Sequence, residues 1–234
     1  ADVATASIDA GAGDVPVATP IIVGGGPLYE VTARARDLLL GIPALIVLSP
    51  LLLGCVLAIR MTSPGPAMFR QERVGRNGVP FRIYKFRTMT SGTGDNRHRD
   101  YVTRLLTDGA EEAAEDGVFK LADDDRITRV GALLRRLSID ELPQLINVIS
   151  GEMSLVGPRP GIDYEVELYR PEDRARLLVK PGMTGLWQAT ERNHVGMREM
   201  FEIDRRYVQE RSIALDFEIM VKTVGQMVQP SGAR

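Results

Sequence analysis

The sequence is poor in the residues that build disulfides, zinc sites and nucleic-acid surfaces. Its 234 residues include one cysteine, Cys55, and two histidines, His98 and His194. A lone cysteine cannot form an intrachain disulfide, which is typical of a reducing compartment. With so few His and Cys side chains a zinc site is not expected, and carboxylates are the expected reactive groups if the protein is an enzyme. A formal net charge of −2 gives no basic footprint, so we expect no nucleic-acid partner.

Large apolar residues and periodic patterns are missing from the first part of the chain. Residues 1–27 are mostly Ala, Gly, Val, Thr and Pro, so we expect a flexible tail there, with a second short tail over residues 230–234. Gly24-Gly25-Gly26 is not followed by Lys-Ser or Lys-Thr and does not match a phosphate-binding loop. No basic segment precedes an apolar core, so no signal peptide is expected.

Charge is absent from one long stretch. Leu38 to Ile59 are 22 consecutive uncharged residues, and a straight helix of that length reaches ~33 Å, enough for the hydrocarbon core of a bilayer. Pro50 interrupts this run, because proline lacks the amide donor of a helix and clashes with the preceding turn. The hydroxyl of Ser49 could bond the carbonyl that Pro50 leaves free. Pro43 is a second candidate break.

Basic residues flank the apolar run on both sides. A single membrane span should carry more Lys and Arg on one side than on the other. We therefore expect residues 28–60 to form a re-entrant helix-break-helix that bends near Ser49-Pro50 and leaves the membrane on the face where it entered. A buried helix of a soluble fold is the alternative. The flanking arginines are Arg34 and Arg36 before the run and Arg60, Arg70, Arg73 and Arg76 after it.

Residues 61–229 have the composition of a globular domain. Turn signals and a strand-like run from Phe81 to Phe86 predict a small sheet near residues 67–87. Apolar periodicity predicts helices over residues 127–137, 139–149 and 213–228. We expect the apolar stripe of the last helix to face the core rather than a membrane, because its polar side has few Lys and Arg residues. The fold class is therefore mixed α/β, rich in helix, with a small sheet and a membrane hairpin packed on a globular domain.

The stretch "SIDELPQL" carries two adjacent carboxylates, Asp140 and Glu141, at the start of a predicted helix. Ser138 and Glu141 match a capping box, in which both side chains bond free amides of the first turn. This leaves Asp140 unexplained. Neighbouring helical residues point about 100° apart, so the two carboxylates should have separate roles. A helix start also favours anions such as phosphate, and three arginines lie nearby in sequence: Arg129, Arg135 and Arg136.

Three motifs occur in a fixed order: "KFRTM" (residues 85–89), "RRLSIDELPQLINVISGEMSLVGPRP" (135–160) and "PGMTGLWQ" (181–188). Together with the upstream apolar run and its Ser-Pro, they resemble the bacterial sugar transferase family. These are the monotopic phosphoglycosyl transferases, small form, that start glycan assembly on polyprenol phosphate. The resemblance covers Arg34 to Val228. Departures at Pro43, Leu137 and Asp125 remove no reactive group.

The resemblance implies roles for particular residues. Asp140 would be the nucleophile that attacks the β-phosphate of a UDP-sugar, expels UMP and forms a phosphosugar-aspartyl intermediate, which polyprenol phosphate then attacks. With a reference pKa near ~3.9, the Asp140 carboxylate needs no base to ionise it at neutral pH. Glu141 would hold Mg²⁺, a hard cation that binds carboxylate and phosphate oxygens. Trp187 could stack on uracil, or could be an interfacial or core residue. The expected phosphate clamps are Lys85, Arg87, Arg135 and Arg159.

The resemblance also implies a location: the cytoplasmic face of the bacterial inner membrane, in contact with lipid. The oligomeric state and the identity of the sugar stay open. Two other functions remain as alternatives. A nucleotide-binding α/β glycosyltransferase could use Asp123 and Asp125 as a metal site and would release UDP, although the repeated strand-helix units of such a fold are not predicted. A membrane-associated nucleotide-sugar sensor would release no product.

Overall fold

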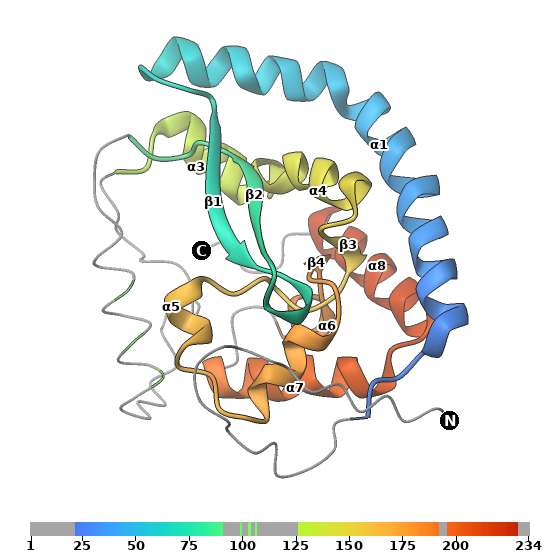
Figure 1. Ribbon diagram of the computed structural model, residues 1–234. Helices are drawn as coiled ribbons and strands as arrows, with labels where there is room; N and C mark the ends of the chain where they lie inside the picture. The colour runs from blue at the N-terminus through green and yellow to red at the C-terminus, as the bar shows by residue number, and fades with distance from the viewer. Residues whose placement is uncertain are drawn as a thin grey trace.

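The computed structural model describes residues 22–90, 126–191 and 196–228, together with Arg99, Thr103 and Leu106. Most of the two predicted tails lies outside these residues, as do His98, His194, Asp123 and Asp125. Within the described part helices predominate, with two small sheets, as predicted for a helix-rich mixed fold (Figure 1). The elements in order are α1 (Gly26–Thr62), β1 (Met68–Val74), the 3-10 helix η1 (Arg76–Gly78), β2 (Pro80–Phe86), α3 (Arg129–Arg136), the 3-10 helix η2 (Ile139–Gln144), α4 (Leu145–Ser150), β3 (Ser154–Val156), α5 (Asp163–Val166), the 3-10 helix η3 (Asp173–Leu178), β4 (Gly182–Thr184), α6 (Leu186–Thr190), α7 (Met197–Glu210) and α8 (Ile213–Val228).

Helix α1 is a continuous helix that curves around the outside of the protein (Figure 1). The expected interruption at Ser49-Pro50 is therefore wrong, since helix runs through both Pro43 and Pro50. The reason is that the hydroxyl of Ser49 replaces the amide donor that Pro50 lacks, as the sequence predicts. Ser49 Oγ donates to the carbonyl of Ile46 at 2.7 Å, and this is the carbonyl that the missing amide of Pro50 would have bonded. Re-entry into one membrane face stays a prediction.

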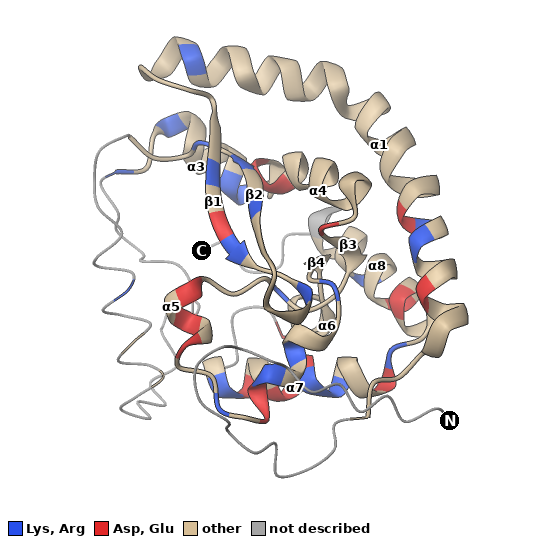
Figure 2. Cartoon of the chain, viewed as in Figure 1, with Lys and Arg blue, Asp and Glu red and all other residues tan. Residues whose placement is uncertain are grey.

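Helix α1 is long and apolar enough to cross a membrane by length and composition. Only 11% of its most apolar 18-residue window is buried, which does not fit the alternative of a soluble core helix. Figure 2 shows that charged residues lie towards its two ends and that its middle has none. The charged N-terminal part is tied to the body: Arg34 donates to the carbonyls of Val148 and Ile149 at 2.6 and 2.7 Å. In addition, Arg36 forms an ion pair with Asp216.

Strands β1 and β2 form the predicted sheet as an antiparallel hairpin, with Met68 opposite Phe86 and Val74 opposite Pro80. Alternation along β2 places Ile83 and Lys85 on the same face of the hairpin. This hairpin packs against η2, so β2 brings Lys85 towards the acidic pair.

The predicted helix over residues 139–149 is split into η2 and α4. Pro143 is the physical reason, because it has no amide to donate within a regular α-helix and the chain forms a tighter 3-10 turn instead. Gly151 ends α4 in the left-handed conformation at φ 88°, as the sequence predicts. The prediction of a capping box is wrong. Ser138 has a left-handed φ of 55°, and its side chain makes no capping hydrogen bond.

Helix α8 has the predicted bounds, but the prediction that its apolar stripe faces the core is wrong. The buried face carries Asp216 and Ile219. Asp216 accepts hydrogen bonds from Tyr29 at 2.7 Å and from Tyr207 at 2.9 Å, and these bonds turn the polar side of α8 inward. Large apolar side chains that are 42–63% exposed are left on the outside: Ile213, Phe217, Val221 and Val224.

Candidate active site

A cavity of about 530 Å³ contains both carboxylates of the "SIDELPQL" stretch. One side is charged, and it includes five of the side chains singled out from the sequence. The other side is made by β4, α6 and α8 and is largely uncharged. The charged side comprises Lys85, Arg135, Arg136, Asp140, Glu141 and Arg159, and the other includes Met183, Thr184, Trp187, Gln188, Met220, Thr223, Val224 and Gln226.

Two charged groups fix Glu141. Lys85 Nζ donates to Glu141 Oε1 at 2.8 Å, and both side chains are mostly buried. Burial alone would raise the pKa of Glu141, but Lys85, followed by Arg159, holds it at about 2. Burial lowers the pKa of Lys85, and Glu141 opposes that change. Glu141 is therefore an anion at any physiological pH.

Asp140 lies in a different electrostatic environment. Burial, and then the adjacent charge of Glu141, raises the pKa of Asp140 above its usual range, while Lys85 and Arg135 oppose this shift. Neighbouring carboxylates with pKa values pushed apart are a pattern of active sites, where each group has a separate role. This agrees with the expectation that the two side chains do not act as a facing pair.

The turn before the acidic pair sets its direction. Ser138 is in the left-handed region, which costs a non-glycine residue about 1 kcal/mol or more and is concentrated at functional sites. It is the residue that precedes η2, two positions after the end of α3, so Asp140 and Glu141 occupy the first turn of η2. Since Ser138 also lines the cavity, the strain lies where the chain must turn to present Asp140.

Arg135 reaches the cavity from the last turn of α3. Its Nε donates to Thr88 Oγ1 at 3.0 Å, so the "KFRTM" segment supports it. Helix α3 can lie this close because of Gly131, where a Cβ would fall 2.0 Å from the carbonyl oxygen of Thr88. The side chain of Thr128 caps the same helix by accepting from the amide of Gly131 at 2.9 Å.

Arg159 lies in the loop between β3 and α5. This loop packs backbone to backbone against β4: a Cβ on Gly182 would lie 2.1 Å from the amide nitrogen of Gly157. The glycines of "VGPRP" and "KPGMTG" are therefore explained by close packing of the two motifs. As a result, Arg159 and Gln188 line the same cavity, although they come from separate motifs.

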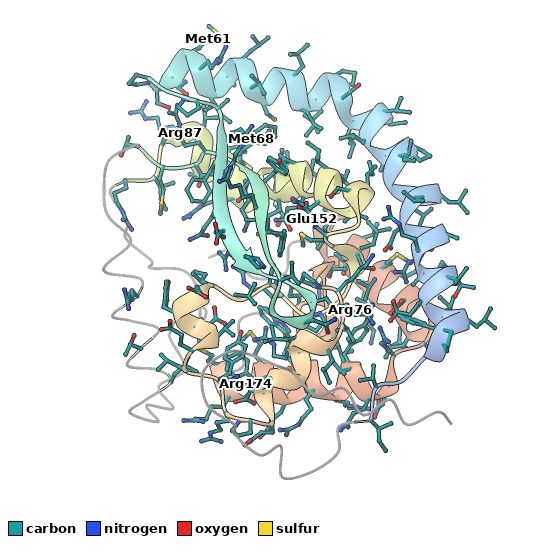
Figure 3. All side chains as sticks on the ribbon, in the orientation of Figure 1. Met61, Met68, Arg76, Arg87, Glu152 and Arg174 are labelled. Atoms are coloured by element: carbon teal, nitrogen blue, oxygen red, sulfur yellow. The ribbon has the colours of Figure 1, made fainter. Side chains whose placement is uncertain are left out.

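Arg87 does not line the cavity, although the sequence places it among the phosphate clamps. Its guanidinium donates to Pro64 O at 2.6 Å and to Ser63 O and Ser63 Oγ at 2.9 and 2.7 Å. Figure 3 shows Arg87 at the end of the hairpin beside the end of α1, with Met61 pointing away from the body. The geometry therefore assigns Arg87 to anchoring the end of α1. Ser49 and Pro50, the predicted membrane break, lie in α1 and do not line the cavity.

Trp187 has two environments. Its side chain is 6% exposed and packs in an apolar cluster with Tyr169, Met200 and Phe201. The residue also lines the cavity. The expectation that Trp187 is a core residue is thus confirmed, and its stacking on uracil stays a prediction.

Several uncharged polar residues of the cavity were missed from the sequence. Gln188 ends the "PGMTGLWQ" motif and could have been found there. Thr223 and Gln226 could not, because α8 was expected to face the other way. Thr223 shares a 2.8 Å hydroxyl contact with Thr184, and Gln226 Nε2 donates to the carbonyl of Ala189 at 2.8 Å. These bonds hold α8 against β4 and α6.

The carboxylates suit a hard cation that is shared with substrate. The described ranges contain no group of three or more His, Cys, Asp or Glu side chains that could hold a metal by themselves. Mg²⁺ commonly takes one or two carboxylates and completes its shell with substrate phosphates and water. Glu141, ionised and beside Asp140, fits that donor set.

Comparison with known proteins identifies a family match. The family model described as "Bacterial sugar transferase" matches residues 28–230. The chain is 40% identical over 198 residues to the exopolysaccharide production protein ExoY of Sinorhizobium fredii, covering 85% of this chain and 86% of that protein. It is 41% identical over 223 residues to the UDP-glucose:undecaprenyl-phosphate glucose-1-phosphate transferase of Caulobacter vibrioides, covering 89% and 76%.

Other relatives are longer proteins. The undecaprenyl-phosphate galactose phosphotransferase of Salmonella typhimurium is 40% identical over 202 residues, which cover 86% of this chain but 41% of that protein. An uncharacterized sugar transferase of Haemophilus influenzae is matched over 42% of its length. The chain thus spans less than half the length of these relatives.

Proposed function

The chain belongs to the bacterial sugar transferase family, and on this basis we propose that it transfers a phosphosugar from a UDP-sugar to polyprenol phosphate. The products are UMP and a polyprenyl-diphosphate-sugar, the first membrane step of bacterial glycan assembly. The observation that carries the proposal is the pair Asp140 and Glu141, with pKa values shifted in opposite directions beside Lys85 and Arg159 in one cavity. The Caulobacter relative is named for UDP-glucose and undecaprenyl phosphate, which supports both substrate classes.

Asp140 takes part in two successive displacements, as the nucleophile in the first and as the leaving group in the second. In the first, a carboxylate oxygen of Asp140 bonds to the β-phosphorus of the UDP-sugar, and the bridging bond to the α-phosphate breaks to release UMP. In the second, a phosphate oxygen of polyprenol phosphate bonds to the same phosphorus, and the bond to Asp140 breaks to regenerate the carboxylate. The raised pKa supports this role, because an ionised carboxylate of higher pKa is the more nucleophilic one.

The cations make an anionic attack on a diphosphate feasible. Lys85, Arg135 and Arg159 lie in the cavity with Asp140 and can bind non-bridging phosphate oxygens. Glu141 would hold Mg²⁺, which supplies further neutralisation of the diphosphate charge. Because Lys85 keeps Glu141 ionised, the metal-binding group is available over the whole working pH range.

The acceptor is a lipid, so the enzyme works at a membrane. The exposed apolar middle of α1 and the exposed stripe of α8 both support membrane contact. We propose that α1 bends within one leaflet at the cytoplasmic face of the bacterial inner membrane, which brings the cavity to the depth of the phosphate headgroups. The basic residues on both flanks of α1 favour this arrangement over a single span.

The test follows product and adduct separately. The purified full chain with polyprenol phosphate and Mg²⁺ should release UMP from a UDP-sugar, and EDTA should abolish the release. Without acceptor, peptide mass spectrometry should find a phosphosugar adduct on Asp140. Asp140→Asn should release no UMP, while the matched control Asp163→Asn, an exposed aspartate of α5, should be unaffected. Release of UDP would indicate a glycosyltransferase, and full turnover by Asp140→Asn would refute the mechanism.

A further inference from the structure

The loop that carries Arg159 is held at four consecutive carbonyls by four different donors. The amides of Gly182 and Val74 bond Pro158 and Gly161 at the two ends of the loop. In the middle, two buried guanidinium groups bond the other two carbonyls. The four distances are 2.9 Å for Gly182 N to Pro158 O, 3.0 Å for Arg176 Nη2 to Arg159 O, 3.1 Å for Arg73 Nη1 to Pro160 O, and 3.0 Å for Val74 N to Gly161 O.

Arg176 is the donor that bonds Arg159 itself, and it lies outside the cavity. Arg176 is 4% exposed as a whole residue, and its guanidinium contacts Glu165 of α5, Asp204 of α7 and the loop. Nε donates to Asp204 Oδ2 at 2.8 Å, and Nη1 donates to the hydroxyl of Tyr169. The guanidinium also lies 4.5 Å from the ring centroid of Phe201. Three sides of this planar group are thus fixed, and the fourth is directed at the carbonyl of Arg159.

A buried charge of this kind needs an explanation beyond stability. Replacing a buried ion network by apolar side chains is often neutral or stabilising. Asp204 balances the charge of Arg176, together with Glu165, which lies 3.9 Å from the Arg176 guanidinium. A lysine in place of Arg176 could pair with the same carboxylates. What only a guanidinium can supply is the rigid fork that bonds Asp204 with one edge and the Arg159 carbonyl with another.

We propose that Arg176 is a positioning residue for the transfer reaction: it fixes the backbone of Arg159, so that the Arg159 guanidinium is held in place before the diphosphate arrives. Pro158 and Pro160 restrict the loop on either side, and Arg176 determines where the restricted segment lies. This inference rests on the function proposed above. It separates Arg176 from an ordinary core residue, because its effect on rate must pass through Arg159.

A double-mutant cycle tests that dependence. Arg176→Lys keeps the charge opposite Asp204 and loses the fork. UMP release is measured for Arg176→Lys, Arg159→Ala and the double variant, with thermal unfolding of each to confirm folding. Misplacing a binding group by about 1 Å can cost ~10²-fold in rate. We expect a loss of that order for Arg176→Lys alone and less than about 3-fold when Arg159 is already Ala.

The matched control is Arg211, another buried fork that bonds a backbone carbonyl and a carboxylate. Arg211 Nε donates to Gly24 O at 2.8 Å, Nη2 lies 2.7 Å from Glu30 Oε1, and neither partner lines the cavity. Arg211→Lys should change the rate by the same factor whether or not Arg159 is Ala. Should Arg176→Lys fail to fold, Asp204→Asn, which removes the charge that Arg176 Nε bonds and preserves side-chain size, should show the same dependence with a smaller loss.

The outcomes separate this inference from the proposed function. Equal losses in both backgrounds, or no loss with Arg159 intact, overturn the positioning role alone. A wild-type rate for Arg159→Ala overturns the phosphate-binding role of Arg159 and this inference with it. A large loss that disappears in the Arg159→Ala background supports both.

Discussion

Lys85 Nζ lies 2.8 Å from Glu141 Oε1 and joins strand β2 to the first turn of η2 across the charged side of the cavity. This contact gives the two adjacent carboxylates different electrostatic environments. The ammonium of Lys85 stabilises the charge of Glu141 in a buried setting, while Asp140 one residue earlier has a raised pKa. A strong ion pair thus keeps Glu141 ionised and leaves Asp140 as the more basic group, which agrees with the separate roles proposed for them.

Lys85→Met should therefore weaken the binding of the transferring phosphate and change the pKa of Glu141. The pKa of Glu141 should rise from about 2, because burial is then no longer opposed by Lys85. Loss of one cationic clamp on the transferring phosphate should lower the rate of UMP release ~10²-fold. The pH-rate profile and the Mg²⁺ concentration for half-maximal rate measure the two effects. Lys222→Met is the control, since Lys222 pairs with Glu218 on the surface of α8; a rate near wild type for Lys85→Met would contradict the prediction.

Arg87→Ala should cost stability and leave substrate affinity intact. Arg87 bonds Ser63 and Pro64 at the end of α1, and bonds that involve a charged donor contribute about 1.5–3 kcal/mol each. We expect the free energy of unfolding to fall by at least about 2 kcal/mol. The KM for UDP-sugar of the folded fraction should stay unchanged. Arg82→Ala, on the exposed side of β2, should change neither quantity; a raised KM with unchanged stability for Arg87→Ala would return Arg87 to the phosphate site.

Local patterns predicted those parts of the fold that depend on neighbours in sequence. The hairpin was found from its turns, and the bounds of α8 and the stop at Gly151 were found from apolar periodicity and glycine. The site was found because its motifs concentrate charged residues. Lys85, Arg135, Asp140, Glu141 and Arg159 do line one cavity, whereas their catalytic roles are still predictions.

Partners that are distant in sequence explain the errors. Nothing near Asp216 in the sequence shows that Tyr29 and Arg36 of α1 bind it, and this contact turns α8 over. Lys85 and Arg87 belong to the same motif, and nothing near them in the sequence shows that Arg87 bonds Ser63 while Lys85 bonds Glu141. The parallel pair β3 and β4, three residues each, is too short for any periodic signal.

The topology of α1 can be read from two exposed positions at its ends. In a Cys55→Ala background, Val31→Cys and Met61→Cys place thiols at side chains that are 68% and 86% exposed. A membrane-impermeant reagent should label both from the cytoplasmic side. Pro50→Ala restores an amide donor to the carbonyl of Ile46, so it should straighten α1 and move a share of the Met61→Cys sites to the other side. With Pro50 intact, labelling of Val31→Cys and Met61→Cys from opposite sides of the membrane would establish a single span.

The charge of Asp140 should affect activity and stability in different ways as the pH changes. Attack on phosphorus requires the ionised carboxylate, and the pKa of Asp140 is raised by burial and by Glu141. Lowering the pH should therefore abolish UMP release with a midpoint above the ordinary range of aspartate. Glu141, with a pKa of about 2, stays ionised throughout and cannot cause this loss.

Stability should move in the opposite direction. A carboxyl whose pKa is higher in the folded than in the unfolded state stabilises the fold when protonated, and this contribution is lost as the pH rises through the folded-state pKa. Asp140→Asn mimics the protonated form, so at neutral pH it should unfold at the same or a higher temperature than wild type while releasing no UMP. The difference should shrink on acidification as the pH falls through the raised folded-state pKa of Asp140, and Asp163→Asn should show neither effect. A less stable Asp140→Asn at neutral pH would mean that the charge of Asp140 supports the fold, which would contradict a raised pKa of this carboxyl in the folded state.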